Sequence, residues 1–261
     1  MSPDLELALR LADAADAIAL GRFRARDLVV ETKPDLTPVT EADRAVEHEI
    51  RAMLGEERRR DAILGEEQGA SGSGRRRWIV DPIDGTRNYA RGIPVWATLI
   101  ALEEDGRVVL GVVSAPALHR RWWAERGSGA HAGGDRVHVS AVRHPEDAVL
   151  SFALEQTVPG LAGRAWHARG YGDFWSHMLV AEGAIDGAID AIGVSVWDLA
   201  AVQVIVEEAG GTFTDFEGHA RIDGRTAISS NGHLHPALLE AVEGVRREPG
   251  VRETAARAAA S

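Results

Sequence analysis

Apolar residues recur at helical spacing in two stretches near the start of the chain. Between residues 4 and 22 they return every three or four positions, which predicts an amphipathic helix. A second helix is predicted to follow Thr40, because a threonine with Asp43 three positions later matches a capping box. Short apolar runs bounded by turn residues predict strands at 62–64, 78–80, 95–102 and 108–113. The glycine- and serine-rich stretch 69–74 predicts a mobile loop.

A second group of elements begins near residue 145. Helices are predicted at 174–182, 199–209 and 236–245, and strands at 148–153, 184–189, 212–215 and 227–230. We therefore expect an N-terminal α+β half, 1–144, and a C-terminal α/β half, 145–246. Residues 247–261 are rich in alanine and arginine and have no apolar face, which predicts a disordered tail.

Composition and charge narrow the class of protein. The chain has 261 residues, of which 45% are hydrophobic, so it can bury a large core. Its formal charge of −11 argues against a nucleic-acid partner, because binding to phosphate backbones needs clustered cations. The absence of cysteine excludes disulfides, thiolate metal sites and a cysteine nucleophile. No apolar run is long enough to span a membrane, and the first eleven residues do not resemble a signal peptide, so we expect a soluble, cytoplasmic protein without a membrane partner.

Two carboxylates follow the apolar run 78–80 within one tight turn. Pro82 fixes its own φ and Gly85 permits a backbone conformation that other residues resist, so Asp81 and Asp84 are expected close together. Like charges at that separation repel unless a cation or a proton lies between them. An Asx turn would explain Asp84 but would leave Asp81 without a role. The pattern therefore favours a metal site.

Further carboxylates stand at the ends of other predicted elements. The complete set is Asp43, Glu66, Asp81, Asp84 and Asp198. Side chains at such ends can converge in a shared crevice. Asp43 alone would be explained as a helix cap, and Asp198 as a favourable acid in a first helical turn. Ligands that are all oxygen suit Mg²⁺ or Mn²⁺, and Mg²⁺ is commonly completed by substrate phosphate, so a small phosphorylated substrate is expected.

Four separated motifs resemble those of the inositol monophosphatase superfamily of Mg²⁺-dependent phosphatases. They are residues 38–43, 65–67, 78–89, and 197–201 continuing through 208–211. The resemblance covers roughly residues 5 to 245. It implies a mixed α/β fold, the αβαβα layered sandwich of the inositol monophosphatase and fructose-1,6-bisphosphatase type, with the active site between two halves and a homodimer as the usual assembly.

The resemblance also implies roles for individual residues. Two or three Mg²⁺ ions per site, or Mn²⁺ in their place, would be held by Glu66, Asp81, the carbonyl of Ile83, Asp84 and Asp198. Thr86 paired with Asp43 would activate the attacking water, with Glu66 assisting through a further ion. Backbone N–H groups of Gly85 and Thr86 would bind the phosphate, which passes directly to water.

The substrate is less strongly indicated than the reaction. Inositol monophosphatases usually carry a glutamate seven residues before the position of Asp198, and Ala191 stands there in this chain. Stretches 33–40, 92–97, 171–174 and 195–198 instead look like those of bacterial histidinol-phosphate phosphatases. Such a substrate carries an ammonium and an imidazole, which call for acids and an aromatic rim. The candidates are Asp173, Asp190, Trp96, Tyr171 and Phe174, although Asp173 could simply cap a helix and Trp96 could belong to the core.

Other functions remain open from the sequence. The same chemistry would serve an inositol-1-monophosphatase, a broad-specificity sugar phosphatase or a nucleotide 3′-phosphatase, but the last lacks a basic pocket here. A regulatory binding protein that keeps the fold without turnover is a further alternative. The complete set of metal ligands and the acidic charge argue against it. The favoured hypothesis is hydrolysis of L-histidinol phosphate in histidine biosynthesis.

Overall fold

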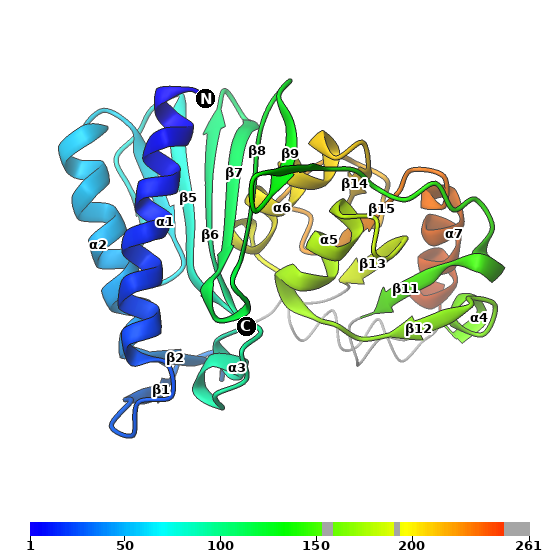
Figure 1. Cartoon of the computed structure of the whole chain (residues 1–261), viewed down its shortest axis with the longest axis horizontal. Helices are drawn as coiled ribbons and strands as arrows, with labels where there is room; N and C mark the ends of the chain where they lie inside the picture. Colours follow the sequence, from blue (N-terminus) through cyan, green and yellow to red (C-terminus); the bar gives the residue numbers. More distant parts are fainter. Residues whose placement is uncertain (153–158, 191–193, 248–261) are drawn as a thin grey trace.

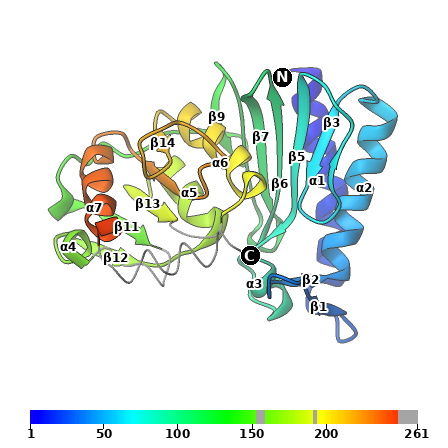
Figure 2. The same ribbon diagram turned by 180° about the vertical axis from the view of Figure 1, so that it is seen from behind.

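The computed structural model describes residues 1–152, 159–190 and 194–247, and these form five layers (Figures 1 and 2). Helices α1 (Pro3–Arg22) and α2 (Glu41–Glu57) cover an eight-stranded sheet. Helices α5 (Asp173–Ala181) and α6 (Val196–Glu208) separate it from a five-stranded sheet. Helices α4 (Pro159–Ala162) and α7 (His235–Arg247) lie on the far side. The αβαβα sandwich is therefore confirmed.

The two helices of the first layer begin at side-chain caps. Ser2 accepts a hydrogen bond from the backbone N–H of Leu5 at the start of α1. At α2, Thr40 Oγ1 accepts from the N–H of Asp43, and Asp43 Oδ2 accepts from the N–H of Thr40 at 2.8 Å. The predicted capping box is confirmed. It fixes where α2 begins and thereby buries the carboxyl of Asp43.

The first sheet is antiparallel except where β3 and β5 pair in parallel. Its spatial order is β10 (Asp135–Val137), β9 (Gly129–Ala132), β8 (Arg120–Glu125), β7 (Arg107–Ala115), β6 (Ala97–Glu104), β5 (Arg76–Asp84), β3 (Ala62–Gly65) and β4 (Gly69–Ser71). Trp78 and Val80 of β5 pack with α1 and α2, whereas Ile79 packs with α6. Because both faces of the sheet are covered, β5 is a continuous apolar run and not an alternating one.

Helix α6 is buried on nearly all sides because it lies between two sheets. Its residues from Leu199 to Val206 are all buried. Gly111 of β7 allows close approach, since a Cβ there would lie 2.8 Å from Ala201 Cα. This packing holds the first turn of α6, including Asp198, against the end of the large sheet.

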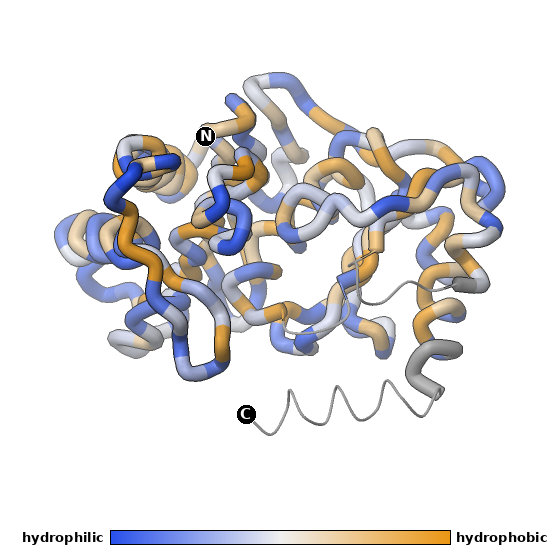
Figure 3. The backbone as a smooth tube through the Cα atoms, turned by 90° about the horizontal axis from the view of Figure 1, so that it is seen from below, coloured by the Kyte–Doolittle hydropathy of each residue, from blue (hydrophilic) through white to orange (hydrophobic). Residues whose placement is uncertain are grey.

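The second sheet has the order β12 (His167–Arg169), β11 (Val149–Phe152), β13 (Gly187–Asp190), β15 (Ala227–Ser230) and β14 (Thr212–Thr214). Strands β12, β11 and β13 are parallel, and β15 is antiparallel to both of its neighbours. The buried residues Leu238 and Val242 of α7 are four positions apart, as expected for a helix with one face on a sheet, and apolar and polar segments are interspersed along it (Figure 3).

Several elements differ from the sequence expectations. The predicted mobile loop 69–74 is wrong in its first part, because β4 pairs there with β3. Not predicted were the hairpin of β1 (Val30–Thr32) and β2 (Pro38–Thr40), the short helix α3 (Thr86–Ala90), and the 3₁₀ turns Pro116–Leu118 and Pro145–Asp147. The predicted tail beyond Arg247 lies outside the described residues. Across the described ranges, no helix has the length and hydropathy needed to cross a membrane.

Candidate active site

Asp81 and Asp84 stand at the end of β5, where the strand leaves its regular register. Pairing with β6 runs regularly to Asp81 and resumes at Asp84 after a shift. Gly85 then adopts a φ of +82°, and a Cβ there would lie 3.0 Å from the carbonyl oxygen of Val95. Glycine is therefore required at this turn, because an L side chain would be both strained and crowded. The turn directs both carboxylates toward the first turn of α6.

Carboxylate oxygens of Asp81, Asp84 and Asp198 lie within 4.8 Å of one another. Asp198 is the third residue of α6, and its Oδ2 accepts from the N–H of Ser195 at 2.6 Å. Burial, reinforced by neighbouring acids, raises the pKa of Asp81 and of Asp84 well above the usual range. Burial likewise raises the pKa of Asp198 to about 7. Such acids favour either protons or a bound cation in their midst.

One carboxylate oxygen of Asp81 provides evidence that this cluster binds a cation. Asp81 Oδ1 is buried and has no hydrogen-bond partner in the part of the chain that the structure describes. A buried carboxylate oxygen without a donor costs free energy, and a coordinated ion would satisfy it. The donor set is oxygen throughout, as Mg²⁺ or Mn²⁺ requires. These residues fit a divalent cation.

Glu66 follows β3 and lies beside Asp81, since the negative charge of Glu66 contributes to the raised pKa of Asp81. Its N–H donates to the carbonyl of Val80 at 3.2 Å, which ties the end of β3 to β5. Lys33 Nζ, from the β1–β2 hairpin, lies 2.8 Å from Glu66 Oε1 and 2.5 Å from Glu67 Oε1. The single lysine of the chain thus supplies a positive charge at this side of the acidic cluster.

Thr86 and Asp43 meet although they are 43 positions apart in sequence. Thr86 Oγ1 lies 3.3 Å from Asp43 Oδ1 and 3.0 Å from the carbonyl oxygen of Ile83. Asp43 is fully buried, and this burial raises its pKa to about 6. The cap of α2 therefore also places a carboxylate against the hydroxyl of Thr86.

Glu47 supports the segment that carries Glu66, and the sequence did not single it out. It is fully buried, and its carboxylate accepts from the N–H of Glu67 at 2.7 Å and of Gln68 at 3.1 Å. Arg51 Nε donates to it at 2.7 Å. Gly65 makes room, because a Cβ there would lie 2.2 Å from Glu47 Oε1. The sequence did hold a signal, since Glu47 lies one helical turn after Asp43 on the same face of α2.

Asp173 and Asp190 lie near each other beside the acidic cluster. Asp84 Oδ2 accepts from the N–H of Phe174 at 2.7 Å, which joins α5 to the end of β5. Asp173 Oδ2 lies 3.3 Å from Asn88 Nδ2. Although Asp173 is an exposed residue, the desolvation of its carboxyl beside neighbouring acids and the charge of Asp190 raise its pKa to about 6. Buried His177 lies between Ser229 Oγ, 2.7 Å from Nδ1, and Asp190 Oδ2, 2.8 Å from Nε2.

The aromatic rim expected from the sequence needs correction. Trp96 is fully buried and packs against Phe23 and Tyr89, with ring centroids 5.4 and 4.9 Å away, so it belongs to the core. Phe174 is also buried. Tyr171 is half-buried and makes an edge contact with Trp175 at 5.7 Å. Ala191 lies outside the described residues.

Comparison with known proteins agrees with this geometry. The model of the inositol monophosphatase family matches residues 1–247. A histidinol-phosphatase of Mycobacterium tuberculosis is 53% identical, over 90% of this chain and 96% of its own. One from Streptomyces coelicolor is 50% identical, over 90% and 95%. The solved structure of a Thermotoga maritima IMPase superposes with a TM-score of 0.86 at 32% identity, covering 94% of this chain and 98% of its own. This chain therefore belongs to the inositol monophosphatase family, whose members are metal-dependent enzymes.

Proposed function

We propose that this protein is a Mg²⁺-dependent phosphomonoesterase that hydrolyses L-histidinol phosphate to L-histidinol and phosphate. The observation that carries the reaction class is the convergence of Asp81, Asp84 and Asp198, with the orphaned oxygen of Asp81 among them. The two relatives at 53% and 50% identity support the substrate and a role in histidine biosynthesis.

Five groups would hold two or three Mg²⁺ ions, with Mn²⁺ an alternative: Glu66, Asp81, the Ile83 carbonyl, Asp84 and Asp198. When bound, such ions lower the pKa of water and stabilise negative charge on phosphoryl and leaving oxygens. Glu66 must then exchange its contact with Lys33 for the cation. The backbone N–H groups of Gly85 and Thr86 would bind phosphate oxygens.

Thr86 and Asp43 would act on the attacking water. The Thr86 hydroxyl has the Ile83 carbonyl at 3.0 Å and Asp43 Oδ1 at 3.3 Å as possible acceptors, and with the Ile83 carbonyl engaged by an ion its proton would go to Asp43. An oxygen lone pair of Thr86 would then be free to accept a hydrogen bond from water. The two hydrogen bonds from Thr40 hold the other oxygen of Asp43 in place. The phosphoryl group passes directly to water, without a covalent intermediate on the protein.

The two acids Asp173 and Asp190 would recognise the amino-alcohol end of the substrate. Their mutual repulsion contributes to the raised pKa of Asp173, and a cation placed between them would relieve it. The ammonium group of histidinol supplies this charge, and its imidazole can accept or donate a hydrogen bond nearby. Inositol phosphate offers no positive charge for these acids.

Membership of the family is also the basis for the assembly and the cellular location that we propose. We infer a homodimer in a reducing cytoplasm, a setting that fits a chain without cysteine. The active site would lie between an N-terminal half, 1–144, and a C-terminal half, 145–246. Size-exclusion chromatography with light scattering would measure the mass of the assembly.

Phosphate release from a panel of esters tests the proposal. The panel contains histidinol phosphate, an inositol monophosphate, fructose 1,6-bisphosphate and adenosine 3′,5′-bisphosphate, each with Mg²⁺ and with excess chelator. We expect histidinol phosphate to be preferred over inositol phosphate by at least about tenfold in kcat/KM, equivalent to one charged contact. Comparable values would leave a general phosphatase, and undiminished activity with chelator would refute the metal mechanism.

A further inference from the structure

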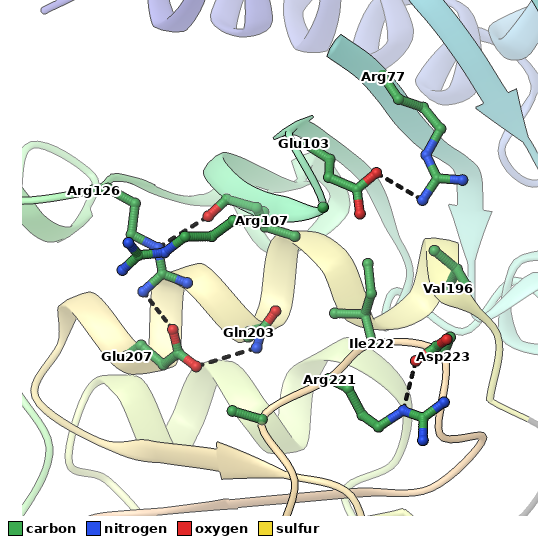
Figure 4. A pocket seen from close by; sticks show the side chains of 13 residues that line it. Arg77, Glu103, Arg107, Arg126, Val196, Gln203, Glu207, Arg221, Ile222 and Asp223 are labelled. Atoms are coloured by element: carbon green, nitrogen blue, oxygen red, sulfur yellow. Dashed lines mark hydrogen bonds and ion pairs between the residues drawn. The ribbon is translucent and has the colours of Figure 1, made fainter. Parts of the chain in front are cut away.

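A cavity of about 620 Å³ lies beside α6, between the β6–β7 hairpin and the segment after β14 (Figure 4). Its size is within the range of pockets that bind small organic ligands. None of the residues that would hold metal, phosphate or histidinol lines it. It is therefore a separate site, and the inference drawn from it does not depend on the proposed phosphatase function.

The charge of this cavity differs from that of the whole chain. Four guanidinium groups and three carboxylates line it, whereas the chain carries a net charge of −11. The arginines are Arg77, Arg107, Arg126 and Arg221. Figure 4 shows them on several sides of the opening, with Arg107 and Arg126 opposite Arg221. The lining residues carry one more guanidinium than carboxylates, and a positive charge in a recess of an acidic protein favours an anionic occupant.

The hydrogen-bonding capacity of these arginines is not fully used. Arg77 Nη2 pairs with Glu103 Oε2 at 2.7 Å, but its Nε is buried and has no partner among the described residues. Arg221 Nε pairs with Asp223 at 2.6 Å and lies 3.9 Å from Asp215 Oδ2. Arg107 is exposed and has no ion pair or hydrogen bond from its side chain within the described ranges. A buried donor without an acceptor is costly, and a guanidinium matches carboxylate, phosphate or sulfonate oxygens well.

The remaining wall is apolar. Val108 and Ile222 are buried residues that reach the cavity, and Val196 at the start of α6 also lines it. Apolar surface of this kind contributes affinity for a flat hydrocarbon group, while the arginines orient its acidic substituent. A bare inorganic anion would leave this wall in contact with water.

We propose that this cavity binds a small organic anion, an apolar ring with an acidic substituent. Arg107 contacts the acidic group, and Val108 and Ile222 contact the ring, while Arg221 lies on the opposite side of the cavity and keeps its ion pair with Asp223. The carboxylates of Glu103 and Glu207 already pair with Arg77 and Arg126, so they leave Arg107 available to the ligand.

Calorimetric titration with 2-naphthalenesulfonate tests this proposal. The full chain is titrated with Mg²⁺ and saturating inorganic phosphate, which blocks the phosphate subsite of the metal centre. We expect saturable binding of one molecule per chain. Neutral 2-naphthalenemethanol should bind at least about tenfold more weakly, because it lacks the charged hydrogen bond.

Variants locate the binding. Arg107→Gln should weaken 2-naphthalenesulfonate binding about tenfold, whereas Arg221→Gln, on the opposite side of the cavity, should weaken it less. Arg143→Gln removes another exposed arginine, one that does not line the cavity, and should leave binding unchanged. The proposal is overturned if the wild-type chain shows no saturable binding, if the neutral compound binds equally well, or if Arg107→Gln binds like wild type. The binding measurement does not depend on phosphatase activity, so an absence of phosphatase activity in the wild-type chain would leave its outcome unchanged.

Discussion

Replacing Glu47 by glutamine should lower the free energy of unfolding and weaken Mg²⁺ binding, although Glu47 is not expected to contact the substrate. In the wild type, this carboxylate accepts from two backbone N–H groups and from Arg51. The amide of glutamine offers one acceptor oxygen in place of two, and it removes the charge that balances Arg51. One N–H of the segment after Glu66 would then face an amide NH₂ group.

The size of the effect follows from the burial of these groups. A hydrogen bond to a charged group contributes about 1.5–3 kcal/mol, and breaking a buried ion pair costs about 3–5 kcal/mol. Arg51 keeps its contacts with Ser71 Oγ and the carbonyl of Gly69, so only part of the pair penalty applies. We therefore expect Glu47→Gln to lower the free energy of unfolding by about 3 kcal/mol. For a chain of this size, that corresponds to a fall in Tm of about 6–12 °C.

Two assays on the Glu47→Gln variant test whether Glu47 stabilises the fold and positions Glu66. Urea unfolding measures the loss of stability, and phosphatase activity as a function of Mg²⁺ concentration measures the effect on Glu66. Loss of a group that orients a metal ligand typically weakens metal affinity about 10- to 100-fold, so the half-saturating Mg²⁺ concentration should rise by that factor. Glu56→Gln changes an exposed residue of the same helix and is the matched control. Unchanged unfolding and Mg²⁺ dependence in Glu47→Gln would show that the carboxylate does not position Glu66.

Four further predictions concern the site itself. Asp81→Asn should lower kcat by about two to three orders of magnitude, measured as phosphate release, because it removes a charge shared by the ions. Thr86→Ala should lower kcat about 10²–10⁴-fold with little change in KM; a change confined to KM would contradict a role in water activation. Asp173→Asn should raise KM for histidinol phosphate about 10- to 100-fold and spare a small neutral phosphate ester. Burial raises the pKa of Asp198 from 3.8 to about 7, so between pH 4 and 7 the folded, chelator-treated protein keeps a proton that the unfolded chain loses. The Tm of the chelator-treated protein should therefore fall as the pH rises from 4 to 7, and Mg²⁺ should raise Tm more at high pH than at low pH. A Tm that does not change with pH would contradict this prediction.

Local signals explain which parts of the fold were predictable. The capping box at Thr40 depends only on residues three positions apart, and the helical spacing before it depends only on apolar periodicity. Strand β4 escaped prediction because its stability comes from β3 and from Arg51, which donates to the carbonyl of Gly69. Strand β3 precedes β4 directly in a tight hairpin, but Arg51 lies 18 positions before Gly69, on α2. Glycine and serine in 69–71 therefore indicated a loop where tertiary contacts impose a strand.

The distinction between local sequence signals and tertiary contacts also applies to the candidate active site. Acids that end strands or open helices could be identified as a group, because turn and cap signals mark these positions in sequence. The position of Trp96 stayed open between a pocket rim and the core, because an aromatic residue after a turn suits either. Its contacts with Phe23 and Tyr89 decide the matter, and they depend on how α1 crosses the sheet. Only the tertiary structure supplies that information.

Lys33 connects the electrostatics of the site to its chemistry. Several acids converge here and are buried, and like charges in such a setting must take up protons or cations. Lys33 Nζ neutralises the Glu66–Glu67 side of the cluster, and its own pKa is raised despite partial burial because the two glutamates accept its hydrogen bonds. The lysine lies at the turn of the β1–β2 hairpin, whose last residue caps α2, so only the lysine side chain would need to move for an ion to reach Glu66. A divalent ion would then take over the charge that Lys33 provides, at the same glutamate, while Glu47 keeps the backbone of that glutamate's segment in place.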